Sequence, residues 1–398
     1  MTSAIDLPQA SRKLQSAIRP DRLLDLAVKL IEAPSPTRDG RAVADRLAKI
    51  LADDGFEALR PEAGWPQAPA VVARYDTGRP GRTLQFNGHL DTVHLPFVPP
   101  RVEGGILHGS GASDMKGGVA AMCEAMRALR DAHALPGGAI LLTAHDLHES
   151  PWGDGSQVDA LIDQGFIGDG VLLPEYLCDR LPVVGRGLAI LEARISRDGQ
   201  PVHEVLGGID KPSVIHAGAE LVRRLAELDQ TLRQQTHPMA GRASCFVGQV
   251  HAGEIFNQSP IEFRLSGTRR WLPGTPIAEL RQEYESILAE VAQKTGTHAQ
   301  GQFLVARDAF ELNESDAVTA SLIEAFQAAH AAVAGRPLPR GPKPFVDDGN
   351  TFVARGHVPA ITHGPDGKGA HTVKETVSVD ELVRVAHVYA LTAVAFCQ

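Results

Sequence analysis

The stretch LQFNGHLDT at residues 84–92 decides the fold. An apolar run ends here in a glycine, a histidine and an aspartate. The same pattern returns where AILLTA at 139–144 leads into His145 and where VLLP at 171–174 leads into Glu175. Short apolar runs without alternation are typical of strands buried on both faces of a largely parallel sheet. Because the carboxyl ends of such strands share the edge where ligands bind, we expect these polar residues to converge.

Helical periodicity separates these strands. Helices are predicted at about 19–33, 40–54 and 115–130, because apolar residues recur there at spacings of three and four. Asp114 stands at the start of the third helix, where the positive end of the helix dipole favours an ionised carboxylate. The chain is therefore predicted to be α/β, with a central, mostly parallel sheet and helices on both of its faces.

The pattern changes from about residue 185. Apolar Ile261, Phe263 and Leu265 alternate with polar residues, as in a one-sided antiparallel sheet, and apolar stripes predict helices that begin near Val214 and Ile277. These elements predict an inserted α+β domain over residues 185–299.

After about residue 299 the chain is expected to return to the first domain. A long helix near 315–332, a strand near 358–362 and a last helix from 378 complete it, and the proline-rich run RPLPRGPKP at 336–344 is interpreted as a loop. The first domain is thus predicted to be discontinuous, comprising residues 1–184 and 300–398.

Charge and composition exclude several classes of function. The 398 residues include 39 lysines and arginines against 48 aspartates and glutamates, a formal net charge of −9. That sign argues against affinity for nucleic acid or for an anionic membrane surface. There is no run of 18 apolar residues and no signal-like segment at the start. We therefore expect a cytoplasmic protein with neither a nucleic acid nor a membrane as partner.

Sixteen histidines stand against four cysteines, which form no CxxC pair. This ratio favours a metal site made of nitrogen and oxygen ligands over a thiolate site or a disulfide framework. Two imidazoles and several carboxylates at one sheet edge suit zinc, cobalt or manganese. Asp91, two residues after His89, is placed to orient that imidazole.

Five segments resemble, in order and over nearly the whole chain, the di-zinc superfamily of acetylornithine deacetylase, succinyl-diaminopimelate desuccinylase, aminoacylase and glutamate carboxypeptidase. The segments are FNGHLDTV at 86–93, HGSGASDMKGG at 108–118, HESPWGDGS at 148–156, PE at 174–175 and HGPDGKGAHTVKE at 363–375.

The resemblance implies two divalent metal ions, zinc first, with cobalt or manganese possible and a single-metal site still open. It implies that His89, Asp114 and Glu175 bind one ion. Asp114 would bridge to the other, which Glu149 and His371 would bind.

The resemblance also implies roles in the inserted domain, which it makes a dimerisation and lid domain. His203 stands where family members have a histidine that enters the partner subunit's active site and helps to bind the oxyanion, so a homodimer is implied. Asn257 and Arg270 stand at substrate-binding positions, and the planar guanidinium of Arg270 suits a substrate carboxylate.

The sequence departs from the family at one catalytic position. The superfamily usually carries two adjacent glutamates after the third strand, a general base and then a ligand, and here His148 precedes Glu149. Three explanations are open: His148 acts as base or hydrogen-bond donor, Asp146 or His145 takes the proton, or a single metal supports an atypical reaction.

The function that the resemblance implies is metal-dependent hydrolysis of an amide C–N bond. The expected substrate is a small N-acyl amino acid or a dipeptide-like molecule with a carboxylate, attacked by a metal-activated water. Two alternatives remain open, namely hydrolysis of a non-peptide C–N bond, such as deamination of an activated aromatic amine, and a catalytically silent metal or ligand binder.

Overall fold

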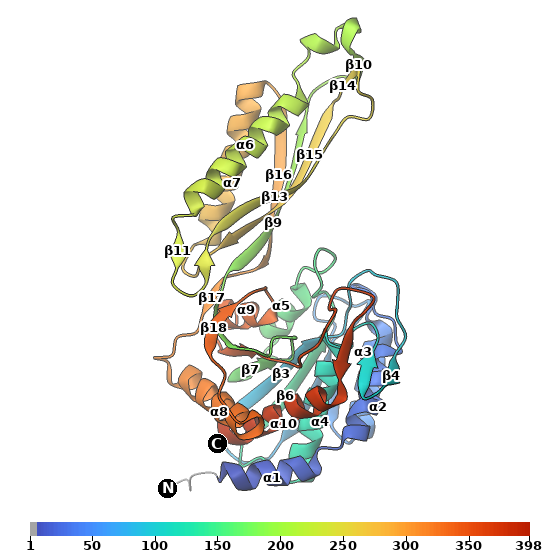
Figure 1. The fold of residues 1–398 in the computed structure, drawn as a ribbon, viewed down its shortest axis with the longest axis vertical. Coiled ribbons are helices and arrows are strands. Elements are labelled where there is room, and N and C mark those ends of the chain that lie inside the picture. Colours follow the sequence, from blue (N-terminus) through green and yellow to red (C-terminus); the bar gives the residue numbers. More distant parts are fainter. Residues whose placement is uncertain (1–5) are drawn as a thin grey trace. The chain divides into compact units, whose positions relative to one another are not determined.

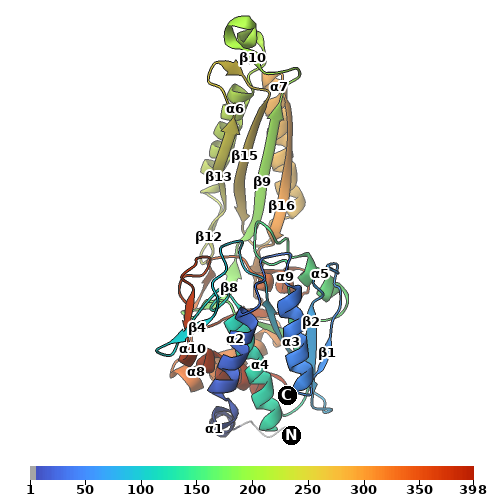
Figure 2. The same ribbon diagram turned by 90° about the vertical axis from the view of Figure 1, so that its right-hand side faces the viewer.

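The computed structural model describes residues 6–398, which form two compact units (Figures 1 and 2). The first unit comprises the chain up to Val183, Leu312–Gly341 and Asp347–Gln398. The second comprises Val184–Glu311 and Pro342–Val346.

A six-stranded sheet in the order β1-β2-β6-β3-β7-β19 forms the centre of the first unit. The last four strands in this order are parallel, and only β1 and β2 add antiparallel pairs at one edge. The prediction of a central, mostly parallel sheet is therefore confirmed. The strands are β1 (Glu57–Leu59), β2 (Val71–Asp76), β3 (Thr83–His89), β6 (Ala139–His145), β7 (Gly170–Leu173) and β19 (Ala360–Thr362).

Helices cover both faces of this sheet, as expected. Leu322 and Phe396 lie against Gly170 of β7, whereas the next residue, Val171, packs with Phe352. Successive strand residues point to opposite faces, so α8 and α10 cover one face and α9 the other (Figure 1). The helices of this unit are α1 (Leu7–Ala17), α2 (Pro20–Ile31), α3 (Arg41–Asp53), α4 (Lys116–Asp131), α5 (Ser156–Asp163), α8 (Ala317–Ala334), α9 (Asp348–Ala354) and α10 (Val379–Phe396).

Two glycines let the first turn of α4 pack closely against neighbouring backbone, at the end of β7 and in the loop before the helix. A Cβ at Gly118 would lie 2.6 Å from the carbonyl oxygen of Pro174, and one at Gly117 would lie 2.2 Å from that of Ala112. The helix begins at Lys116 rather than at Asp114, which precedes it by two residues. The close approach of Gly118 to Pro174 places the start of α4 beside the end of β7.

A four-stranded antiparallel sheet in the order β13-β15-β9-β16 forms the second unit, with α6 and α7 on the same face (Figures 1 and 2). Phe263 and Leu265 of β15 are buried under these helices and Arg264 is exposed, which confirms the predicted alternation. The elements are β9 (Gly187–Ser196), β13 (Ser244–Ala252), β15 (Glu262–Trp271), β16 (His298–Arg307), α6 (Val214–Leu232) and α7 (Ile277–Thr295).

Smaller sheets complete the chain. Their strands are β4 (Arg101–Glu103), β5 (Ile106–His108) and β20 (Thr376–Ser378) in one sheet, β8 (Leu181–Gly185), β17 (Phe310–Glu311) and β18 (Arg340–Lys343) in another, and the pairs β10 (Val202–His203) with β14 (Gln258–Ser259) and β11 (Thr236–His237) with β12 (Gly241–Arg242).

Two expectations differ from the structure. The chain does not leave the antiparallel sheet at residue 300, because β16 pairs with β9 as far as Arg307 and the second unit runs to Glu311. The run at 336–344 is not wholly a loop, because Arg340–Lys343 form β18. This strand lies at the edge of its sheet, where a proline is tolerated because no ladder partner needs its missing N–H.

Within the described residues, α8 is the one helix with the length and apolar composition of a membrane span, which is weak evidence by itself. It packs against α10 and buries Leu322, Ile323 and Phe326. We therefore interpret α8 as a core helix.

Candidate metal centre

The structure brings the five predicted metal ligands together in the first unit. His89 ends β3, and Glu149 and Glu175 follow β6 and β7. Asp114 lies just before α4, and His371 lies between β19 and β20. All but the half-exposed His371 are buried. The convergence follows from the parallel strands, whose carboxyl ends meet at one edge.

Asp114 lies between two sets of donors. Its Oδ1 is 3.2 Å from His89 Nε2, and its Oδ2 is 3.1 Å from His371 Nε2. His371 Nε2 is also 3.1 Å from Glu149 Oε2, while His89 Nε2 is 3.9 Å from Glu175 Oε1. One carboxylate therefore faces both imidazoles.

The charges in this cluster strongly perturb one another. Hydrogen bonds to Asp114 and Glu149 raise the pKa of His371 to about 10. Burial, reinforced by the negative charge of Asp114, raises the pKa of Glu175 well above its usual range. Burial also acts against ionisation of Asp114, yet hydrogen bonds from His371 and His89 hold the pKa of Asp114 below its usual range.

This donor set fits a divalent cation. Glu175 Oε1 is buried and has no hydrogen-bond partner within residues 6–398, although a buried carboxylate needs a donor or a cation. The donor atoms of His89, Asp114 and Glu149 lie within 4.8 Å of one another, as do those of His89, His148 and Glu175. Imidazole nitrogens and carboxylate oxygens suit zinc, cobalt and manganese.

Asp91 acts on His89 differently from the expectation. His89 Nδ1 lies 2.9 Å from the backbone carbonyl oxygen of Asp91 and 3.6 Å from the carboxylate. The Asp91 carboxylate instead accepts the backbone N–H groups of His148 and Glu149, at 3.1 and 3.0 Å. The peptide group of Asp91 orients His89, and the side chain holds the loop that bears Glu149.

His148 lies inside the cluster. Its ring stacks on that of His89, with centroids 4.0 Å apart and planes at 5°. Its Nδ1 is 2.9 Å from Asp348 Oδ2, and its Nε2 is 3.5 Å from Glu175 Oε1. His145 Nε2 lies 3.1 Å from the same Asp348 oxygen.

Asp146, which the sequence left open as a proton acceptor, has another role in the structure. Its carboxylate accepts backbone N–H groups from Arg38, Gly40 and Leu147. These bonds engage both carboxylate oxygens in holding the backbone.

Asp348 and Glu375 were not identified from the sequence as site residues. Glu375 accepts the backbone N–H groups of Gly111, Ser113 and Asp114, at 2.9, 2.8 and 2.7 Å, and so fixes the loop before α4. The available signals were the final glutamate of HTVKE and the acidic pair in DDGNTF. Such a pair is usually interpreted as a helix cap, which Asp347 does provide for α9.

The predicted residues of the inserted domain fall into two places in the second unit. His203 of β10 and Asn257, just before β14, are neighbours, with Asn257 Nδ2 2.9 Å from His203 Nε2. Arg270 lies near the far end of β15, opposite Ser244. Burial and the charge of Arg186 lower the pKa of Arg270.

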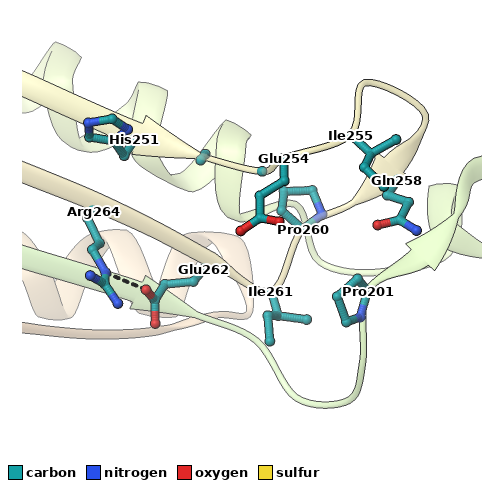
Figure 3. A pocket seen from close by; sticks show the side chains of 11 residues that line it. Pro201, His251, Glu254, Ile255, Gln258, Pro260, Ile261, Glu262 and Arg264 are labelled. Atoms are coloured by element: carbon teal, nitrogen blue, oxygen red, sulfur yellow. Dashed lines mark hydrogen bonds and ion pairs between the residues drawn. The ribbon is translucent and has the colours of Figure 1, made fainter.

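A surface hollow of about 680 Å³ also lies on the second unit (Figure 3). Pro201, Ile255, Gln258 and Pro260 line part of it, and an ion pair between Arg264 and Glu262 flanks it. None of the predicted ligands lines this hollow, so it adds nothing to the metal centre.

A parallel-sheet domain with buried imidazoles and carboxylates at the strand ends has the features of a metal-binding protein whose ligand site lies at the edge of the sheet. The model of peptidase family M20/M25/M40 matches residues 85–395. The chain belongs to this family and is a hydrolase that acts on amide C–N bonds.

Individual relatives agree with this assignment. A succinyl-diaminopimelate desuccinylase of Halorhodospira halophila is 28% identical over 387 residues, which cover 92% of this chain and 96% of that protein. One of Methylobacterium radiotolerans is 40% identical over 144 residues, 33% of this chain and 36% of that protein. The aminopeptidase PepT of Bacillus cereus has a similar fold, with a TM-score of 0.77 at 20% identity over 96% of this chain and 99% of its own.

Proposed function

We propose that the chain hydrolyses the amide bond of a small N-acyl amino acid or dipeptide-like substrate that carries a carboxylate. The observation that carries this proposal is the convergence of two imidazoles on three buried carboxylates, one of which has an oxygen without a hydrogen-bond partner among the described residues. The named relatives support this substrate class, because they include desuccinylases and an aminopeptidase.

We infer that two divalent ions, zinc first, with cobalt or manganese as alternatives, occupy the cluster. His89, Asp114 and Glu175 would hold one, and Asp114, Glu149 and His371 the other. Bound ions of this kind polarise a carbonyl group and lower the pKa of water. Asp91 contributes by fixing His89 and the loop that bears Glu149.

The proposed substrate contacts lie in the second unit. Arg270 would bind the substrate carboxylate, for which its planar set of donors is suited. His203 would bind the developing oxyanion from the partner subunit, and Asn257 would hold His203 in place, in keeping with their contact of 2.9 Å. The second unit would act as the dimerisation and lid domain.

The proposed homodimer is supported by the outer strand of the second unit. β13 lies at the edge of its sheet and exposes Phe246 and Val250, at 63% and 51% of their surface. An exposed apolar edge strand is prone to pair with another chain. A cytoplasmic location is also proposed, and the acidic net charge supports the proposal that neither a nucleic acid nor an anionic membrane is a partner.

A substrate panel tests the proposal. Purified protein would be incubated with N-succinyl and N-acetyl amino acids, dipeptides and activated aromatic amines, and amine or ammonia release measured. We expect amine release from an N-acyl amino acid or a dipeptide, loss of that release on chelation, and recovery with zinc, cobalt or manganese. Ammonia release from aromatic amines alone, or no reaction by metal-loaded protein, would contradict the proposal. Nothing in the relatives reported above favours either alternative.

A further inference from the structure

We propose that His148 is itself a metal ligand, completing the site of His89, Asp114 and Glu175, and that Asp348 positions it. The inference rests on the proposed metal centre and goes beyond it. The family resemblance puts a general base at this position, whereas the contacts of the imidazole are those of a ligand.

The Nδ1 side of the ring fixes its orientation. Nδ1 lies 2.9 Å from Oδ2 of the buried Asp348, and a carboxylate oxygen accepts hydrogen bonds. The neutral imidazole therefore carries its proton on Nδ1 and leaves a lone pair on Nε2. Metal-binding histidines usually donate their other ring N–H to a carboxylate or carbonyl in this way. The backbone carbonyl of Asp91 serves the neighbouring His89 in the same manner.

The Nε2 side of the ring faces an oxygen that needs a cation. Nε2 lies 3.5 Å from Glu175 Oε1, the buried oxygen that has no hydrogen-bond partner in the described part of the chain. A lone pair opposite an ionised carboxylate is unfavourable, because neither atom can then donate. A cation between the two atoms satisfies both.

Three separations among the four donor atoms are close to those of a tetrahedral site. Ligand atoms bound to zinc at about 2.0–2.1 Å lie about 3.4 Å apart in tetrahedral geometry. His148 Nε2 is 3.5 Å from Glu175 Oε1, and His89 Nε2 is 3.2 Å from Asp114 Oδ1 and 3.9 Å from Glu175 Oε1. These three separations bracket the expected one.

The two imidazoles stack, and their donor atoms lie close together. The rings are nearly parallel at 4.0 Å, and the donor atoms of His89, His148 and Glu175 lie within 4.8 Å of one another. The His148 side chain is 11% exposed. It is therefore enclosed in the cluster, as a ligand is.

This assignment makes the two metal sites unequal. One has two nitrogen and two carboxylate donors, which fills a tetrahedral ion, whereas Asp114, Glu149 and His371 supply three donors and leave a position open. We expect the four-donor site to bind its ion more tightly and to fill first.

A cobalt titration of the metal-free full-length protein tests the assignment. Visible d–d absorption and competition with a chelator give the coordination and dissociation constant of each equivalent. The variants are His148→Gln and Asp348→Asn, with His94→Gln as control, because His94 also stacks on an aromatic ring, that of Trp152, but bonds the backbone carbonyl of Thr37.

In the wild-type protein we expect two equivalents, the first tighter. His148→Gln should weaken the first equivalent by about 100-fold or more and change its absorption bands, and Asp348→Asn should weaken it by about 10- to 100-fold, as loss of an outer hydrogen-bond partner does. His94→Gln should match the wild type.

Wild-type affinity and spectrum in His148→Gln would overturn the ligand role and leave the metal centre intact. Failure of the wild-type protein to bind cobalt would overturn the metal centre and the proposed function together. If far-UV circular dichroism shows that His148→Gln does not fold, Asp348→Asn serves as the test instead. Wild-type affinity for the first equivalent of cobalt in folded Asp348→Asn would also overturn the assignment.

Discussion

Buried carboxylates near the cluster hold the backbone that carries the metal ligands. Glu375 accepts three backbone N–H groups from the loop that ends at Asp114, and Asp91 accepts those of His148 and Glu149. These side chains fix the positions of the ligands without being proposed as ligands themselves. Their removal should therefore affect metal affinity through the geometry of the loops.

Glu375→Gln tests this role. An amide keeps one acceptor oxygen but turns a donor toward the N–H groups, so we expect about 1–3 kcal/mol of lost stability and about 10-fold weaker metal binding. Urea unfolding and metal titration measure the two effects. Glu103→Gln, at an exposed glutamate paired with Arg101, is the control. Unchanged metal affinity in Glu375→Gln would show that the loop holds its shape without this carboxylate.

Glu149→Ala tests the open site. The change removes one of three donors to the proposed second ion, so native mass spectrometry should find one metal per chain where the wild-type protein holds two, and amide hydrolysis should fall with it. Retention of two ions and full activity would mean that HESPWGDGS at 148–156 has been matched wrongly to the acidic segment of the family.

His363→Leu tests a pH effect away from the metal ligands. Burial, with the charge of Arg384 adding to it, holds the pKa of His363 well below its usual range, so the folded protein keeps this imidazole neutral. The unfolded chain takes up the proton near pH 6.5, and the stability that depends on His363 is present above that pH and lost below it. Between pH 6.5 and 5.5 the wild-type free energy of unfolding should fall by about 1 kcal/mol more than that of the variant.

Denaturant unfolding at several pH values measures this difference. His216→Leu, at an exposed histidine, should leave the wild-type slope unchanged. Equal pH slopes in His363→Leu and wild type would contradict the account.

The sequence located most of the candidate site because strand ends can be predicted from apolar runs. His89, Glu149 and Glu175 each follow such a run. Spacing alone could not reveal that Asp91 reaches His89 through its peptide oxygen, since the carbonyl and the carboxylate belong to the same residue. Asp348 was missed because its partners are 200 or more residues away in sequence.

At the scale of elements, the contact between α4 and the end of β7 matters most for the site. It depends on a helix with almost no exposed face, all of whose residues from Lys116 to Leu129 are buried. Gly118 permits the approach, because any larger residue would meet the backbone beside Glu175.

Gly118→Ala tests this packing. Alanine normally stabilises a helix relative to glycine by about 0.5–1 kcal/mol. Here the added Cβ would lie 2.6 Å from the Pro174 oxygen, so we expect a loss of about 1–3 kcal/mol and weaker metal binding. Thermal unfolding and metal titration are the measurements. Gly248→Ala, where the nearest atom is 3.5 Å away, is the control, and a more stable Gly118→Ala protein would refute the packing argument.

The elements that the sequence mispredicted are those that pairing decides. β18 contains a proline and forms because an edge strand can omit one donor, which composition does not reveal. β16 extends past the expected boundary because β9 offers a partner along its whole length. Local periodicity identified the helices and buried strands, whereas such pairing depends on residues distant in sequence.

For the whole molecule, the alternation of apolar runs and helical periodicity predicted the α/β class, and the order of the sequence motifs predicted the family. The fold was predictable because one apolar pattern recurs at the ends of several parallel strands. The acidic net charge argued against nucleic acid and anionic membranes as partners but did not identify the substrate.

The proposed homodimer can be tested at β13. Phe246→Glu places a charge on the exposed edge, where it would have to be desolvated in a paired sheet, so we expect the dimer to dissociate to monomers. Sedimentation velocity over a range of concentrations measures the shift. Phe97→Glu, at a phenylalanine 41% exposed in the first unit, is the control. A wild-type protein that remains monomeric at every concentration would disprove the proposed dimer.

The metal content per chain tests the central claim most directly. It would be determined by elemental mass spectrometry on full-length protein purified without added metal. The measurement would be repeated after incubation with zinc and removal of the excess zinc. The proposed centre predicts two divalent ions per chain after incubation, lost together with amide hydrolysis when a chelator is added. A protein that retains no divalent ion after incubation with zinc would contradict the account.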